Sequence, residues 1–128
     1  MEISEELEDW LIATGDTVVR KLAAGSLLSP NEQLLYEVWL IYIETSNGGL
    51  SQYFGNRGLE QWRRCVAAAS AGGLVSFAPF AARVETLIAG ARDPYKALIK
   101  RGRAADEVYY EHQSSIVDEL RSKYATVA

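Results

Sequence analysis

The sequence predicts an all-α protein, a compact bundle of about six to seven helices around a buried central helix. Three observations support this fold class. Apolar side chains recur at helical spacing, capping signals mark the expected helix starts, and no segment alternates β-branched and polar residues as a strand would. Hydrophobic residues make up 48% and charged residues 23% of the 128 residues, ordinary values for a folded chain. We therefore expect residues 1–128 to form a single all-helical domain.

The first helix is expected from about Ser4 to Ala24. Gly15 is a candidate bend within it, and Gly25 is a suitable stop. Apolar residues at helical spacing define its inner face, and these are Ile3, Leu7, Trp10, Leu11, Val18 and Leu22.

The second helix has the clearest start signal. Ser29 can cap the helix, Pro30 suits its first position, and Glu32 completes a Ser-x-x-Glu capping box. The pair Gly48-Gly49 then ends the helix. These signals fix both ends of the element that we expect at the centre of the bundle.

Residues 30–46 form this expected central helix because apolar side chains surround nearly all of it. Only Gln33, Glu37 and Glu44 share a narrow polar stripe, which we expect to reach solvent or an arginine partner. A helix that is apolar almost all round is a buried one. The apolar residues are Leu34, Leu35, Tyr36, Val38, Trp39, Leu40, Ile41, Tyr42 and Ile43.

Caps and glycine stops place the remaining helices. Gly72 ends one helix, Ser76 is expected to cap the next, and Asp93 followed by Pro94 starts a short one. Short connections between the helices favour antiparallel packing around the central helix. The expected spans are 50–54, 59–71, 76–89, 93–102 and 105–124.

The charge of the chain is unevenly distributed. The net charge is −4, from −7 over residues 1–56, +6 over 57–103 and −3 over 104–128. Such asymmetry bears on the choice of partners more than on the fold. The acidic first ten residues lack the features of a signal peptide, and the longest uncharged run is interrupted by a turn. We therefore expect a cytoplasmic protein without a membrane partner, in which the single cysteine stays reduced.

No group of residues predicts catalysis or metal binding. Cys65 falls on the apolar side of a helix, where a free cysteine is usually a small core residue, and His112 lies at the edge of an inner face. Glu37 and Glu44 are seven residues apart on one helix, about 10 Å, which is too far to share a water directly. A cleft beside these two carboxylates is the one enzymatic alternative. We expect no catalytic residue, no metal and no cofactor.

A basic segment lies in the middle of the chain. Clustered lysine and arginine residues can contact phosphates, but the protein is acidic overall, with a pI of about 5.0. We expect no direct nucleic-acid binding and expect these bases to pair with the acidic terminal helices. The segment contains Arg92, Lys96, Lys100, Arg101 and Arg103, and Arg63 and Arg64 precede it.

Two acidic ridges are expected on outer helix faces. Each ridge has carboxylates at i, i+4 and i+11, a line of like charge that gains nothing for its own helix. A row of carboxylates can replace a row of phosphates against a cationic DNA-binding surface. The ridges are Glu5, Asp9 and Asp16 on the first helix, and Glu107, Glu111 and Asp118 on the last, whose inner face carries Tyr109, Ile116, Leu120 and Tyr124.

One motif carries a family resemblance. The stretch reads N-G-G-L-S-Q-Y-F-G-N and follows the aromatic, apolar second helix. It resembles the signature of a bacterial family named for a DNA-mimic protein of neisserial bacteria, over roughly residues 32–124, with Leu50 in place of the more usual aromatic residue. The motif residues are Asn47, Gly48, Gly49, Gln52, Tyr53, Phe54 and Asn56.

The resemblance implies an all-helical fold and, from the namesake of the family, a regulatory role in which an acidic surface imitates DNA and occupies a transcription factor. The motif itself we interpret as structural. Gly48 and Gly49 permit a tight reversal, Tyr53 and Phe54 fill the core, and the polar pair Gln52 and Asn56 can bond exposed helix ends.

The leading hypothesis is therefore a non-catalytic protein-binding protein whose acidic ridges contact a basic, DNA-binding partner. A different interaction module, such as a toxin-neutralising or scaffold protein that uses the turn over residues 49–56, is the alternative, and an enzyme is third. A homodimer is left open.

Overall fold

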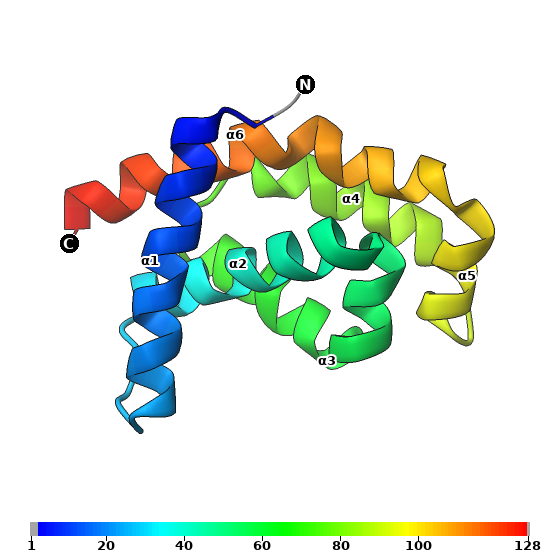
Figure 1. Ribbon diagram of the computed structural model, residues 1–128. Helices are drawn as coiled ribbons and strands as arrows, with labels where there is room; N and C mark the ends of the chain where they lie inside the picture. Colours follow the sequence, from blue (N-terminus) through cyan, green and yellow to red (C-terminus); the bar gives the residue numbers. More distant parts are fainter. Residues whose placement is uncertain (1–2, 128) are drawn as a thin grey trace.

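The computed structural model describes residues 3–127, which form six α-helices and contain no strand (Figure 1). None of the helices within this range is long and apolar enough to cross a membrane. The all-α prediction is confirmed. The helices are α1 (Glu5–Ala23), α2 (Pro30–Gly48), α3 (Leu50–Ala71), α4 (Phe77–Ile88), α5 (Pro94–Arg101) and α6 (Arg103–Val127).

Helix α2 lies between α1, α3 and α6, as expected for the central helix (Figure 1). Its apolar residues are buried or pack against the core. Trp62 of α3, which is 0% exposed, lies at the centre of an aromatic cluster beside α2. The rings of Tyr53, Phe54, Phe77 and Phe80 all lie within 6.5 Å of the Trp62 ring, centroid to centroid. Burial of these large side chains is the main source of stability.

Helix α3 contains a sharp kink at Gly58. The backbone there has φ 82° and ψ 176°, which favours glycine and divides the helix into residues 50–57 and 59–71. These correspond to the two helices expected over 50–54 and 59–71, so the first is longer than predicted. The described residues contain six helices if α3 is counted as one and seven if the kink divides it, and both numbers agree with the expected six to seven.

Most of the predicted caps are present. The Ser29 hydroxyl accepts from the Glu32 N–H at 3.2 Å, and the Glu32 carboxylate accepts from the Ser29 N–H at 2.9 Å. The Asp93 carboxylate caps α5 by accepting from the Tyr95 and Lys96 N–H groups. Two of the expected starts are thus confirmed in atomic detail.

The cap expected from Ser76 is wrong. Its hydroxyl and its N–H both donate to the Glu119 carboxylate, at 2.6 and 2.8 Å, and the Val75 N–H donates to the same group at 3.3 Å. A carboxylate from α6 therefore caps the start of α4. Glu119 lies 43 and 44 positions from Ser76 and Val75 in the sequence, so no local capping pattern predicts this contact.

The bend expected at Gly15 is replaced by a close contact between helices. A Cβ atom at this position would lie 2.2 Å from Cδ1 of Trp39. Gly15 is buried and inside α1, so its missing side chain gives α2 room to place an indole against α1. This contact sets how closely the two helices approach.

Candidate functional site

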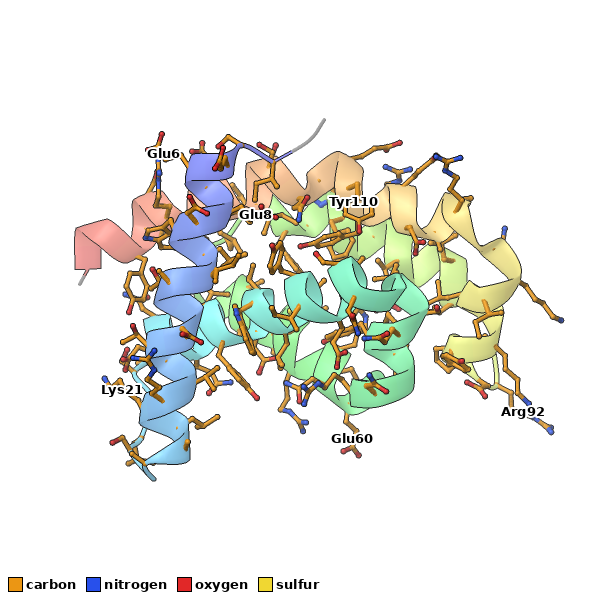
Figure 2. The ribbon with its side chains drawn as sticks, viewed as in Figure 1. Glu6, Glu8, Lys21, Glu60, Arg92 and Tyr110 are labelled. Carbon is orange, nitrogen blue, oxygen red and sulfur yellow. The ribbon has the colours of Figure 1, made fainter. Side chains whose placement is uncertain are left out.

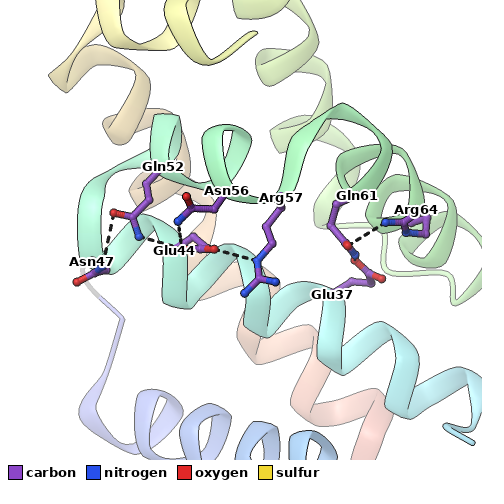
Figure 3. Close-up of polar contacts among 8 residues, drawn as sticks. All are labelled: Glu37, Glu44, Asn47, Gln52, Asn56, Arg57, Gln61 and Arg64. Atoms are coloured by element: carbon purple, nitrogen blue, oxygen red, sulfur yellow. Dashed lines mark hydrogen bonds and ion pairs between the residues drawn. The ribbon is translucent and has the colours of Figure 1, made fainter. Parts of the chain in front are cut away.

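Two carboxylates lie buried on α2. Glu37 is 1% exposed and Glu44 is 6% exposed, so neither carboxylate reaches solvent. The expected arginine partner is present for Glu44, which pairs with Arg57, whereas Glu37 is bonded by two glutamine amides. Burying a charge costs free energy unless hydrogen bonds compensate for the lost water. The partners of both groups come from both parts of α3 and from α2 itself, and they include two residues of the family-like motif (Figure 3).

Three side chains of α3 enclose Glu44 (Figure 3). Oε1 accepts from Nε2 of Gln52 at 2.8 Å and from Nδ2 of Asn56 at 3.1 Å. Oε2 accepts from Nε of Arg57 at 2.9 Å. Burial raises the pKa of Glu44, but these three donors outweigh it and hold the pKa below its usual value. Glu44 is therefore ionised inside the protein.

This arrangement corrects our interpretation of the motif. Gln52 and Asn56 were expected to bond exposed helix ends, whereas both amides donate to the Glu44 carboxylate. Asn47 donates to the other end of the Gln52 amide, from Nδ2 to Oε1 at 3.4 Å. The polar positions of the motif thus connect the end of α2 to the start of α3 through one buried charge.

Glu37 has weaker compensation. Its two oxygens accept from Nε2 of Gln33 at 2.8 Å and from Nε2 of Gln61 at 2.6 Å, both neutral amides. Burial is the largest influence and raises the pKa of Glu37 above its usual value. Arg64 does not bond the Glu37 carboxylate. It donates to Oε1 of Gln61 at 3.0 Å, and its charge stabilises the carboxylate from a greater distance.

The glycine and aromatic positions of the motif have the expected roles. Tyr53 and Phe54 are buried in the aromatic cluster. Gly49 has φ 86°, and a Cβ atom there would lie 2.8 Å from the Asp106 carboxylate. That carboxylate accepts from the Leu50 N–H at 2.8 Å, so α6 supplies the cap at the start of α3.

An acidic groove lies between α1, the end of α2 and α6. It has a volume of about 930 Å³ and is lined by Ile3, Glu5, Glu8, Asp9, Ser46, Tyr110 and Gln113. Figure 2 shows Glu8 on the side of α1 that faces Tyr110. The Tyr42 hydroxyl donates to Glu8 at 2.6 Å and fixes this carboxylate at the edge of the groove. We name this feature the acidic groove.

The first acidic ridge contributes to the acidic groove in part. Glu5 and Asp9 are exposed and line it, and neither has an ion pair within the described residues. Asp16 is exposed two turns further along α1 and pairs with Arg20 at 3.2 Å. Ridge and groove therefore share two carboxylates, and Glu8 adds a third that the ridge pattern did not include.

The second acidic ridge is exposed on α6 but partly neutralised. Glu111 forms an ion pair with Arg83 of α4, whose hydrogen bond and charge together hold the pKa of Glu111 below its usual value. Glu107 lies 3.8 Å from Arg103 on its own helix. Asp118 has no ion pair in the part of the chain that the structure describes. The more strongly anionic surface is thus the one on α1.

The basic segment lies at the end of the molecule away from α1 (Figure 1). Arg92 and Lys96 are exposed and form no ion pair with any described residue, and neither do Lys100 and Arg101. Only Arg103 of this segment pairs with an acidic terminal helix among the residues described, through Glu107. The expected general pairing of the basic segment with the terminal helices is therefore wrong. The acids of the terminal helices that pair with another helix use other bases, Glu111 with Arg83 and Glu6 with Arg121.

Cys65 and His112 lie where the sequence placed them. Cys65 is fully buried on α3, and burial raises the pKa of its thiol well above the usual value. His112 is half-buried and packs on the ring of Phe80, with Nδ1 2.9 Å from the Val108 carbonyl oxygen. A buried, protonated thiol is a poor nucleophile.

Several residues of the site carried no recognisable sequence signal. Arg57 and Gln61 reach α2 from α3, and Asp106 reaches α3 from α6. Tyr110 reaches α2 by donating to the Thr45 carbonyl oxygen at 3.4 Å. Each contact depends on packing between helices, which spacing along one helix does not report.

The comparison with known families agrees with the resemblance carried by the motif. Residues 26–127 match the family described as DMP19-like protein, and the chain belongs to this family. The matched region begins after α1 and includes the motif, Glu44 and α6. No curated protein and no solved structure matches the chain.

Proposed function

We propose that this protein is a non-catalytic DNA mimic that occupies the nucleic-acid-binding surface of a basic protein partner. The observation that supports this function best is the acidic groove. Glu5 and Asp9 are exposed there without an ion pair to any described residue, beside Glu8. Unpaired carboxylates at one place offer a cationic protein the charge that it otherwise finds on phosphates.

Membership of the DMP19-like family supports the same function, because the resemblance to the family implies a protein that imitates DNA. The matched region excludes α1, however, and Glu5, Glu8 and Asp9 lie on α1. We infer that α6 and the motif are features of the family, whereas the anionic surface of this member depends on its own first helix.

Binding should depend on individual groove carboxylates and on salt. In one experiment, the protein captures its partner from an extract of its native cells, and affinity for the purified partner is then measured for Glu5→Lys, Asp9→Lys and the control Glu60→Lys. Glu60 is exposed on α3, well away from Glu8 and Tyr110 (Figure 2). All three substitutions change the net charge equally.

We expect Glu5→Lys and Asp9→Lys each to weaken binding by at least about tenfold and Glu60→Lys to have little effect. Raising the salt concentration should weaken binding by the parent protein steeply. Equal affinities for all three variants would reject the acidic groove as the binding surface.

A further inference from the structure

A second pocket lies directly beside the motif. It has a volume of about 570 Å³ and opens between the first half of α3 and the start of α5. We name it the motif pocket. It is lined by Gly48, Ser51, Gln52, Phe54, Gly55, Asn56, Asp93 and Tyr95.

We infer that the motif pocket binds a guanidinium group, and that its natural ligand is an arginine side chain of a protein partner. The choice of an arginine on a protein rests on the proposed function, whereas the preference for a guanidinium rests on the groups that line the pocket. Four features of the pocket favour a guanidinium: the orientation of its amides, the end of α2, Asp93 and Tyr95.

The buried charge of Glu44 orients the amides. A carboxylate only accepts hydrogen bonds, so Gln52 and Asn56 must turn their NH₂ groups inward to Glu44. The carbonyl oxygen of Asn56 then points away from Glu44 (Figure 3). The Gln52 oxygen already accepts from Asn47, so the wall of the pocket presents the Asn56 oxygen as an acceptor, and Ser51 adds a hydroxyl without a partner among the described residues.

The end of α2 supplies a negative potential. Gly48 is the last residue of α2 and lines the pocket, and the last turn of this helix contains no basic residue. The carbonyl end of a helix carries a partial negative charge that favours a cation. A cationic ligand would complement this end, which no basic residue of its own last turn neutralises.

Asp93 and Tyr95 complete the site from α5. Oδ1 of Asp93 caps α5, while Oδ2 accepts no hydrogen bond from the described residues and can meet a ligand. Tyr95 is 40% exposed and lies against Gly55, where a Cβ atom would come within 2.8 Å of its ring. A planar guanidinium, with five donors and a flat face, can bond such acceptors and stack on an aromatic ring.

The inference is tested by titrating the full-length protein with N-acetyl-arginine amide and following its backbone NMR signals. N-acetyl-citrulline amide is the control ligand because it has nearly the same shape and no charge. Asp93→Asn is the test variant, since asparagine also caps a helix, and Asp118→Asn removes an equal charge elsewhere.

We expect the arginine compound to shift the signals of Gly48, Ser51, Gly55 and Tyr95, with citrulline much weaker. Asp93→Asn should weaken arginine binding about three- to fivefold, as expected for an exposed ion pair, and Asp118→Asn should leave it unchanged. Absent shifts at these residues, equal shifts with citrulline, or no effect of Asp93→Asn would overturn the inference.

The result is separable from the proposed function. Glu5→Lys changes the acidic groove and should leave the arginine titration unchanged even where it prevents partner binding. If instead the arginine compound fails to bind while Glu5→Lys still weakens partner binding, the motif pocket is rejected and the acidic groove is retained.

Discussion

The carboxylate of Glu44 accepts a 2.8 Å hydrogen bond from the side-chain amide of Gln52, eight residues further along the chain. This contact joins the central helix to the family motif, so a buried charge on α2 is bonded directly by a side chain of α3. It also determines which atoms of the motif face outward. The stability of the helix pair and the chemistry of the motif pocket therefore have a common origin.

Replacing Glu44 with glutamine should destabilise the protein more than the same change at Glu37. Glu44→Gln removes an acceptor that faces Arg57, and we expect a loss of about 1–3 kcal/mol in the free energy of unfolding at pH 7. Glu37→Gln removes a charge whose direct hydrogen bonds come only from neutral amides, so a smaller loss or a gain is expected. Urea unfolding measures both, and an equal loss would contradict this account of the two carboxylates.

The two carboxylates should respond to pH in opposite directions. The pKa of Glu44 is lowered in the folded protein, so its contribution is present above the usual value of 4.5 and is lost as pH falls through the folded pKa. The deficit of Glu44→Gln relative to the parent should therefore shrink in acid. The pKa of Glu37 is raised above 4.5, so the parent should gain stability relative to Glu37→Gln as pH falls toward that value. Urea unfolding of each variant across this pH range tests both signs.

Removing the hydroxyl of each of two buried tyrosines, Tyr53 and Tyr42, should change the stability of the protein differently. The Tyr53 hydroxyl is buried without a hydrogen-bond partner among the described residues, whereas the Tyr42 hydroxyl donates to Glu8. Tyr53→Phe should leave stability unchanged or raise it by up to about 1 kcal/mol, and Tyr42→Phe should lower it by about 1 kcal/mol. Thermal unfolding distinguishes the pair. A clear loss in Tyr53→Phe would show that its hydroxyl has a partner.

Gly15→Ala should destabilise the contact between α1 and α2. The added methyl group overlaps the indole of Trp39, and overpacking of this kind costs about 1–3 kcal/mol, partly offset by the better helix propensity of alanine. Adding Trp39→Leu should remove the overlap. In a double-mutant cycle, Gly15→Ala should therefore cost less stability in the Trp39→Leu background than in the parent. Additive effects of the two substitutions would contradict the proposed overlap.

The sequence predicted the helices well because their signals are local. The capping box at Ser29, the cap at Asp93 and the apolar surface of α2 all depend on residues within one or two turns of each other. The caps supplied by Glu119 and Asp106 come from a distant helix, and no spacing rule reports them.

The site was predicted less well for the same reason. Ridge spacing identified Glu5 and Asp9 but missed Glu8, which lies toward Tyr42 and joins the acidic groove through helix packing. The motif was recognised by its letters, yet its role in enclosing Glu44 depends on the reversal at Gly49, which folds α3 back along α2.

Displacement of DNA from the partner shows whether the acidic groove takes the place of DNA. The purified partner is bound to a labelled DNA duplex, and the protein is added while release of the DNA is followed by fluorescence anisotropy. We predict that the parent protein and Glu60→Lys release the DNA in proportion to their concentration, while Glu5→Lys and Asp9→Lys do so far less. A ternary complex in which the DNA stays bound, or equal release by all four proteins, would contradict the proposal that the acidic groove takes the place of DNA.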